Sequence, residues 1–371
     1  MVSGMGRPEI ESGFSLVELM ISLVLGLILT LGVTQIYLSS SDTYRLTDGL
    51  ARIQENARFA SEFLGREIRE AGGDGCLIDG GTLTDIRDNP DDPNTTGILG
   101  WEFNGTEPGD SYTIPFSGSD DLDEHIPDND SQWTNGSADD LSTELNSVEG
   151  NVVEGSDILY MEGARSHDLN GESVTNLGGS SINLSGNSGI ERDIAMQITS
   201  ADCTESRIFY KNNAANASSI VAGGSDNQTG GSVPDITDPP MSDDLTVTIF
   251  RASAFYVGEG ADGAPALFVQ NLEGPSGANT QELLSNVENM QVLYGTGDAE
   301  GADDYESAGD VGNWDDVVSV RLALLMRSDE NGAEDEKTRS FNLLGAEIDT
   351  PSDDRVRLVM MKTVGLRNRL E

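Results

Sequence analysis

Basic residues are scarce in this sequence. The chain has 371 residues, with 21 Lys and Arg against 65 Asp and Glu, which gives a formal net charge of −44. Proteins bind phosphate groups through cationic side chains that displace counterions, so this composition argues against nucleic acid as a partner. An anionic membrane surface would also repel most of such a chain. We therefore expect a solvated acidic surface that keeps the protein soluble, rather than an acidic active site.

Histidine and cysteine are almost absent, which limits the metal and redox chemistry that the chain could support. The two histidines, His125 and His167, lie in polar segments without a ligand-like partner at helical spacing, and we expect both to be exposed loop residues. The two cysteines are Cys76 and Cys203. They would be free thiols in the cytosol and a disulfide in an oxidising compartment, so the residues alone leave their state open.

Recognisable catalytic motifs are missing. The sequence has no G-x-S-x-G, H-E-x-x-H, P-loop or paired C-x-x-C pattern. Acidic clusters occur at residues 88–92, 120–124 and 128–130, but none has the glycine and terminal glutamate of an EF-hand loop. We expect solvated charge runs there and keep calcium binding as a hypothesis. The sequence thus predicts a protein that is not an enzyme and needs no cofactor. The alternative, a membrane-anchored enzyme, is disfavoured because the sequence offers no catalytic site.

Charge is absent from residues 19–41. At ~1.5 Å per residue, a helix over the apolar run 19–38 crosses the ~30 Å hydrocarbon core of a bilayer. The run is long for a secretory signal and no A-x-A site follows it, so a membrane span explains it better than a cleaved signal peptide. Glu18 lies at the start of this apolar helix, where an unpaired charge costs several kcal/mol. A plain membrane anchor has no use for such a residue.

Proline is absent between Pro8 and Pro90, so nothing in this interval forbids a continuous helix. After the apolar run, apolar residues recur at three- and four-residue steps and define a stripe: Leu46, Leu50, Ile53, Ala57, Ala60, Leu64, Ile68 and Ala71. We predict one helix over residues 14–71, ~87 Å long, that ends at a glycine pair and packs on a sheet through this stripe. Any kink would come from Gly26 or Gly32.

Apolar residues become sparse again in three later segments, 79–150, 163–190 and 212–243, which we predict to be loops or irregular insertions. Short strands are predicted at residues 156–161, 194–198, 207–210, 245–256 and 266–271. The clearest alternation, at 318–326 and 355–366, predicts two half-buried antiparallel strands that cover the stripe of the helix. The predicted fold class is α+β: a long N-terminal helix packed on an antiparallel β-sheet head with large acidic loop insertions.

The segment Gly13-Phe14-Ser15-Leu16-Val17-Glu18, followed by the apolar run, resembles the signal of type IV prepilins and type II secretion pseudopilins. The resemblance implies that a prepilin peptidase cleaves after Gly13 and methylates the new N-terminal amine of Phe14. It also implies that Glu18 pairs with the amine of a neighbouring subunit, because a buried unpaired charge is costly.

The same resemblance divides the chain into four parts. They are a cytoplasmic leader at 1–13, a transmembrane and assembly half of the helix at 14–41, an amphipathic half at 42–73 and a β-rich periplasmic head at 74–371.

Later segments resemble the PilW-type minor pilins by their order along the chain. They lie at residues 58–72, 155–159, 200–203, 283–295, 314–327 and 363–369. The resemblance implies a structural, low-abundance subunit that takes part in type IV pilus assembly within a tip or priming complex. Two alternatives stay open: a J-type minor pseudopilin of type II secretion, or a tip adhesin that binds through its acidic loops.

The resemblance also implies a location and a set of partners. The protein would cross the inner membrane once, with its N-terminus in the cytoplasm and its head in the periplasm, and later join the pilus at the cell surface. Its partners would be the lipid bilayer, the prepilin peptidase and methyltransferase, the assembly platform, other minor pilins and the major pilin. In the periplasm we expect Cys76 and Cys203 to form a disulfide between the end of the helix and the strand at 207–210, worth ~4–5 kcal/mol.

Overall fold

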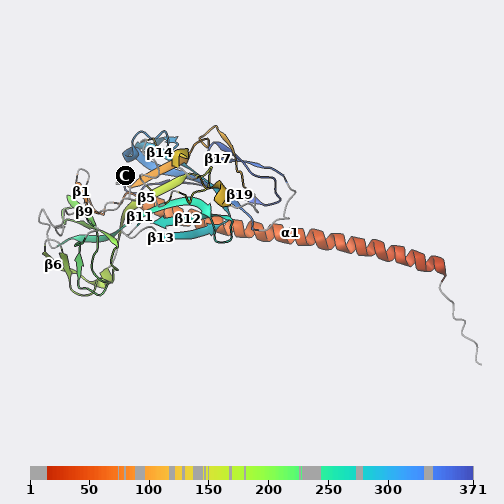
Figure 1. Ribbon diagram of the computed structural model, residues 1–371, viewed down its shortest axis with the longest axis horizontal. Helices are drawn as coiled ribbons and strands as arrows, with labels where there is room; N and C mark the ends of the chain where they lie inside the picture. The colour runs from red at the N-terminus through yellow and green to blue at the C-terminus, as the bar shows by residue number, and fades with distance from the viewer. Residues whose placement is uncertain are drawn as a thin grey trace, which may run out of the picture.

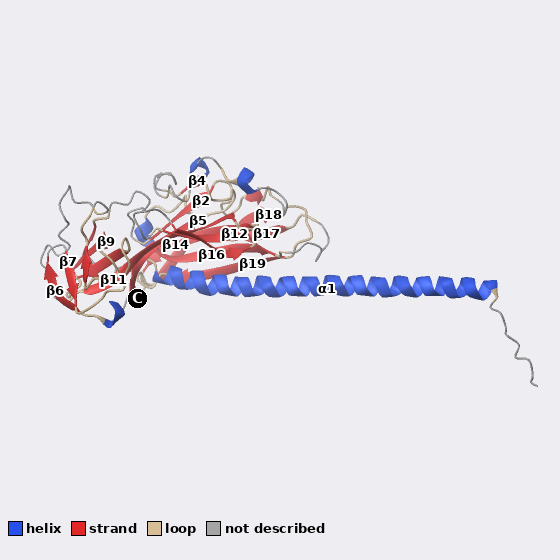
Figure 2. Ribbon diagram, turned by 60° about the horizontal axis from the view of Figure 1, so that its bottom comes forward, coloured by secondary structure: helices blue, strands red, loops and turns tan. Residues whose placement is uncertain are grey.

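The protein is seen here in a computed structural model, in which one long helix projects from a β-rich head (Figure 1). The structure describes residues 15–73, 75–78, 81–87, 97–116, 122–127, 130–136, 145, 148, 150–166, 169–178, 181–224, 227, 244–272, 279–329 and 337–370. The helix and the head lie along one axis, so the molecule is strongly elongated (Figure 2).

Helix α1 (Leu16–Glu70) has 55 residues and no break, which corresponds to a length of ~83 Å. It begins after the N-cap Ser15 and ends at Ala71, and Gly72 follows in the left-handed region with φ 68°. The predicted helix over residues 14–71 is therefore confirmed to within two residues. Figure 2 shows a straight rod without a kink at Gly26 or Gly32, as expected for a helix without proline.

Two sheets build the body of the head in the described part of the chain. The first has the order β1-β9-β8-β11-β5-β2-β4, with β12 beside β11 and β13 beside β12. Its strands are β1 (Thr82–Asp85), β2 (Ile98–Phe103), β4 (Trp133–Thr134), β5 (Ile158–Ser166), β8 (Ala195–Thr199), β9 (Glu205–Tyr210), β11 (Thr246–Glu259), β12 (Pro265–Asn271) and β13 (Asn279–Ser285).

The second sheet has the order β15-β14-β16-β19 and is antiparallel throughout. Its strands are β14 (Val287–Asp298), β15 (Gly301–Glu306), β16 (Val317–Arg327) and β19 (Arg357–Gly365). The stripe predicted on α1 packs here: Ile53, Ala57, Ala60, Leu64, Ile68 and Ala71 are buried, and Leu46 and Leu50 are partly buried. The predicted packing of the helix on a sheet is therefore confirmed.

Strand β16 departs from the half-buried strand that its alternation predicts, because both of its faces are covered. One face carries Leu322 and Leu324 toward the core under α1, and the other carries Ala323 and Leu325 into a second cluster. A small third sheet lies over that second face, in the order β17-β18-β3. Its strands are β3 (Ser111–Thr113), β17 (Ser340–Leu343) and β18 (Ala346–Asp349).

The end of the head away from the start of α1 forms a separate lobe, which we call the distal lobe (residues 169–224) (Figures 1 and 2). It contains β8, β9 and a sheet of β6 (Val174–Gly178), β7 (Ser181–Leu184) and β10 (Ser219–Val221). Its apolar core is separate from the main one and is lined by residues such as Ile182, Met196 and Phe209. Strand β11 joins the two parts, because its first residues pair with β8 and its later residues with β12.

The segments expected to be loops contain short strands, which corrects the prediction from composition. Residues 79–150 include β1 to β4, residues 163–190 include β6 and β7, and residues 212–243 include β10. Strand β2 is buried along its whole length, so it shows no alternation that a two-residue period could detect. The other strands have at most five residues and lie between turn-forming residues, which is why composition alone favoured loops.

Candidate assembly site

The start of α1 forms a capping box. The backbone N–H of Ser15 donates to Glu18 Oε2 at 3.1 Å, and the N–H of Val17 donates to Ser15 Oγ at 3.4 Å. Glu18 thus stabilises the start of its own helix in two ways. It accepts a hydrogen bond from a backbone N–H that has no intrahelical partner, and its negative charge interacts favourably with the positive end of the helix dipole. No ion pair to Glu18 exists among the described residues. The predicted processing positions, Gly13 and Phe14, lie outside the described residues.

The first half of α1 is exposed along all its sides. Large apolar residues from Leu16 to Leu38 are 52–74 % exposed, and this stretch of the helix is long and apolar enough to cross a membrane. Its hydroxyl groups are satisfied within the helix, since Ser22, Thr30 and Thr34 each donate to the carbonyl four residues earlier. A surface like this is stable only against lipid or other apolar helices.

The second half of α1 is fixed to β19 by a close contact between a glycine and a lysine. Lys362 Nζ donates to the carbonyl oxygen of Ser61 at 2.6 Å. A Cβ atom at Gly65 would lie 2.5 Å from that nitrogen, so a side chain at this point would displace the lysine from its present position. The contact joins residues 301 positions apart in the chain.

The C-terminal end of α1 is capped by the head. Arg165 donates to the carbonyl of Glu70 at 2.8 Å and pairs with Glu67 at 3.2 Å. The N–H of Arg367 donates to the carbonyl of Arg69, and Asn368 donates to that of Ala71. These contacts satisfy carbonyl groups that a helix end leaves without intrahelical partners. The helix is therefore locked to the head at its end and free at its start.

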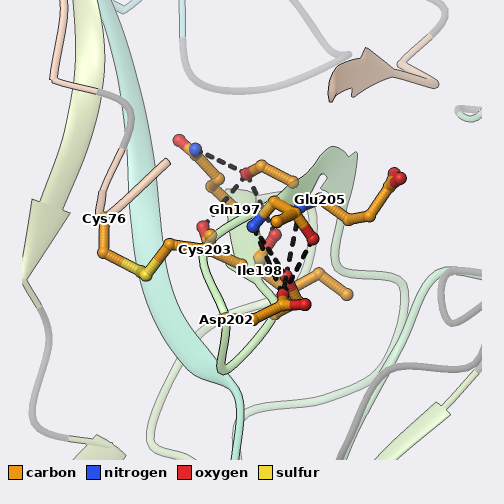
Figure 3. Close-up of a disulfide and its surroundings, with 10 residues drawn as sticks. Cys76, Gln197, Ile198, Asp202, Cys203 and Glu205 are labelled. Carbon is orange, nitrogen blue, oxygen red and sulfur yellow. Dashed lines mark hydrogen bonds between the residues drawn. A yellow bond between two sulfur atoms is a disulfide. The ribbon is translucent and has the colours of Figure 1, made fainter. Parts of the chain in front are cut away.

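Cys76 and Cys203 form a disulfide, with their Cα atoms 5.4 Å apart. Cys203 lies in the turn between β8 and β9, where Asp202 accepts hydrogen bonds from Ser200 and Thr204 (Figure 3). The chain enters the distal lobe directly after the bridge, through β1, which pairs in parallel with β9. The predicted pairing is confirmed, and the bridge ties the end of α1 to the distal lobe.

A buried polar loop joins the two main sheets, and sequence reasoning assigned it no role. The carboxylate of Asp157, fully buried, accepts from the N–H of Phe103 on β2 at 3.2 Å and from that of Val292 on β14 at 2.8 Å. The hydroxyl of Ser156 accepts from the N–H of Met290 at 2.8 Å. The sequence resemblance marked residues 155–159, but their partners on β14 lie more than 130 positions further along the chain.

A second carboxyl group, Glu102, lies beside this loop. Burial raises its pKa to about 7. Hydrogen bonds from Ser307 and from the backbone of Gly309 lower the pKa, but their effect is smaller than that of burial. Burial also raises the pKa of Asp157, and Glu102 adds to that shift through charge repulsion. Burial first, and nearby acidic charge second, therefore keep both carboxyl groups from ionising freely.

A buried ion network crosses the base of the head, near the place where α1 leaves it. Glu288 on β14 accepts from Arg357 on β19 at 2.6 and 2.9 Å and from Arg327 on β16 at 3.3 Å. Arg357 also pairs with Asp353 at 2.6 Å. Glu288 and Arg357 are inaccessible to solvent, so each needs the other to offset its desolvation. The basic residues near the C-terminus stood out in the sequence, but nothing in the sequence identified Glu288 as the acidic partner of Arg357.

The histidines and acidic clusters fit the predictions less closely. His125 is half-buried in a short 3₁₀ helix, η1 (Leu122–His125), and its Nδ1 lies 3.0 Å from Glu154 Oε1, so it is not the exposed loop residue expected. His167 and the cluster at 88–92 lie outside the described residues, as do parts of those at 120–124 and 128–130. Among the described residues, no group of three or more potential ligand side chains is arranged to hold a metal ion.

Two family profiles match the chain, one near each end. The profile described as the prokaryotic N-terminal methylation motif matches residues 10–34, which include the capping box and the start of the apolar half of α1. The profile described as type IV pilus-assembly protein W matches residues 254–368, which contain the second sheet. No curated protein and no solved structure is significantly similar to the chain.

A methylation motif that opens a long apolar helix, packed at its other end on an antiparallel sheet, defines a type IV pilin. Within that class the chain carries a PilW-type domain at residues 254–368, and the two matches support a minor pilin involved in type IV pilus assembly. The motif implies processing by a prepilin peptidase and assembly with other pilus components. The fold and the apolar helix make it a membrane-anchored protein of the α+β class.

Proposed function

We propose that the chain is cleaved after Gly13, is methylated at the new amine of Phe14, and uses Glu18 to enter a tip or priming complex. The observation that carries this proposal is the place of Glu18. It lies in the first turn of a helix whose apolar half is exposed, so it enters the apolar environment together with that surface. The only described hydrogen bond to its carboxylate comes from the N–H of Ser15.

Glu18 has an energetic reason to prefer a cationic partner in the assembled state. A hydrogen bond to a neutral N–H offsets only part of the cost of a carboxylate in a medium of low dielectric. The free amine of a processed neighbouring subunit offers a full opposite charge. Subunits would therefore be drawn into the one register that brings this pair together.

The remaining assignments concern place and partners. A single span over residues 19–38 would hold the subunit in the inner membrane with the head in the periplasm, and the Cys76–Cys203 disulfide supports an oxidising compartment for the head. The partners we propose are other minor pilins, the major pilin, the peptidase and the assembly platform. Neither adhesion through the acidic loops nor a type II secretion role has an observation that favours it over assembly.

The test is Glu18→Ala in a strain that lacks the wild-type chain. We expect normal membrane insertion and leader cleavage but a fall in surface pili of tenfold or more, because each 1.4 kcal/mol lost from docking is a factor of ten in affinity. Glu62→Ala is the matched control, since Glu62 is an exposed glutamate on the amphipathic half of the same helix. Undiminished piliation in the Glu18 variant would refute the docking role.

A further inference from the structure

The carboxyl group of Glu102 is buried in the head with incomplete hydrogen bonding. Glu102 lies on β2 opposite Thr134 of β4 and is 2 % exposed. The side chain of Ser307 and the backbone of Gly309 donate to this carboxyl group. Its Oε2 atom, however, has no hydrogen-bond partner in the described part of the chain. A buried acceptor without a donor costs free energy, and it costs more when the group is charged.

The ionisable groups that face Glu102 offer its charge no compensation. Glu107 and Asp310 repel the charged form, and Asp157 interacts with Glu102 in the same unfavourable way. Tyr294 on β14 is buried beside these acids and stays neutral, because burial raises its pKa. Strand β4, which pairs with β2, contains no ionisable residue. Among the described groups that shift the pKa of Glu102, none carries a positive charge, so the buried carboxyl group favours its neutral form.

A surface loop at residues 307–313 covers Glu102, and we call it the latch loop. It follows β15, and inside it the N–H of Asp310 donates to the carbonyl of Ser307 at 3.1 Å. A Cβ atom at Gly309 would lie 3.7 Å from Glu102 Oε2, so the backbone of the loop passes close to the carboxyl group. One side of the loop is buried and the other is exposed: the buried residues are Ser307, Ala308 and Val311, and the exposed ones are Asp310, Gly312 and Asn313.

The latch loop leads into a 3₁₀ helix, η4 (Trp314–Asp316), which contacts the C-terminal segment of the chain. Arg369 donates to the carbonyls of Trp314 at 2.5 Å and Val317 at 2.7 Å. The two residues before Arg369 are Arg367 and Asn368, which cap the end of α1. A continuous set of contacts therefore runs from Glu102 through the latch loop and η4 to the end of α1.

We propose that the latch loop opens when Glu102 releases its proton to solvent, and that this opening loosens the C-terminal segment that caps α1. With the proton in place, the carboxyl group is neutral and the loop closes over it. Without the proton, opening lets water reach the carboxylate and removes the cost of burying its charge. The hold of the head on α1 would thus respond to the pH around the head. The inference concerns the folded head, so it depends neither on cleavage of the leader nor on the pairing of Glu18.

The test is hydrogen–deuterium exchange of the full chain in detergent at pH 6 and pH 8. The rates are expressed as protection factors, which remove the intrinsic effect of pH on exchange. The closed loop holds the pKa of Glu102 at about 7, whereas an open loop returns it toward the ordinary value of 4.5. The opening equilibrium of the wild type should therefore rise about tenfold between pH 6 and pH 8. Peptides from 307–316 and 363–370 should lose protection by that factor, and in Glu102→Gln they should keep it.

Two variants at exposed positions separate a loop controlled by a proton from one that is merely loose. Glu107→Gln removes a charge that raises the pKa of Glu102, so the loss of protection should begin at a lower pH than in the wild type. Glu300→Gln is the matched control, because Glu300 is exposed in the turn between β14 and β15 and is not among the groups that shift this pKa. It should follow the wild-type profile.

Equal protection of the latch loop at pH 6 and pH 8 in the wild type would overturn the proposal, and so would the same loss of protection in Glu102→Gln. A loop that responds to pH while residues 363–370 do not would disprove the link to α1. If Glu102→Gln does not fold, the profile of Glu107→Gln decides: a shift to lower pH supports the proposal, and a profile like that of Glu300→Gln contradicts it.

Discussion

Glu102 and Asp157 are acids placed inside the head, although the chain has acidic residues to spare on its surface. Asp157 accepts one backbone hydrogen bond from each main sheet, so it fixes how the sheets meet. Glu102 accepts from the loop that leads to β16, through Ser307 and Gly309. Both have raised pKa values because burial disfavours their charged forms. These two buried carboxyl groups of the head therefore release their protons at a higher pH than an ordinary carboxyl group does.

This titration predicts a stability that falls as the pH rises. Below about pH 4.5, Glu102 is neutral in both the folded and the unfolded chain, and its full contribution is present. Between there and its folded pKa of about 7, only the unfolded chain releases the proton, so folding loses free energy, by at most about 3 kcal/mol. The gain in stability of Glu102→Gln over the wild type should be small at pH 5 and larger at pH 8. Tryptophan fluorescence during heating measures this, since Trp101, Trp133 and Trp314 are all buried in the head.

If the difference in stability between the wild type and Glu102→Gln is the same at pH 5 and at pH 8, Glu102 does not titrate in this range. Glu300→Gln serves as the control, because Glu300 is exposed in the turn between β14 and β15 and is not among the groups that shift the pKa of Glu102. It should leave the pH profile unchanged.

Single residues were predictable from the sequence where a local pattern identifies them. Glu18 stands out because it interrupts an apolar run, and Cys76 and Cys203 because there are no other cysteines. Asp157 and Glu288 did not stand out, because they are two among 65 acids. What makes them different is burial beside partners far away in the chain, which no local window contains.

At the scale of elements, the contact between α1 and β19 depends on the absence of a side chain at Gly65. Gly65→Leu should displace Lys362 from the Ser61 carbonyl and lower the stability of the head by about 1–3 kcal/mol, the usual cost of overpacking. The double variant Gly65→Leu with Lys362→Ala should recover part of this loss, because the clash is removed. The midpoint of thermal unfolding of the full chain in detergent measures both.

Gly26→Ala provides the control on the same helix, since a Cβ at Gly26 meets nothing within 4 Å. It should leave the midpoint unchanged or raise it slightly, because alanine favours helix. If Gly65→Leu proved as harmless as Gly26→Ala, the described seam between α1 and β19 would be wrong.

The disulfide is the second contact that holds an element in place, here the distal lobe. Removing it with Cys76→Ser and Cys203→Ser should cost up to ~4–5 kcal/mol, because the bridge closes a loop of 127 residues. A reducing agent should lower the unfolding midpoint of the wild type and leave that of the double variant unchanged. Two free thiols in the non-reduced protein would refute the bridge.

Elements were predictable where burial follows a simple period. The helix was found to within two residues, because its apolar stripe repeats with the helical period. Strand β2 was missed because it is buried on all sides, and β16 was found but given only one buried face, because the third sheet that covers it comes from segments far apart in the chain. Such coverage is a property of the tertiary fold and leaves no period in the strand itself.

At the scale of the whole molecule, the protein divides into a bare apolar rod and a head whose core is fully covered. Among the described residues, the apolar stripe of the rod begins to pack on the head at Leu46 and Leu50, and from Ile53 onward it is buried. The two halves of one helix therefore face different environments, and the boundary between them lies where α1 leaves the head. This division explains how one subunit can wait in a membrane and then join an assembly without refolding its head.

The measurement that tests the account most directly is the mass and N-terminal sequence of the mature polypeptide from cells with an active prepilin peptidase. Processing as proposed predicts a chain that begins at Phe14, carries one methyl group on its amine and has Glu18 as its fifth residue. A chain that still begins at Met1 would contradict the account, because the amine that Glu18 is proposed to meet would then never form.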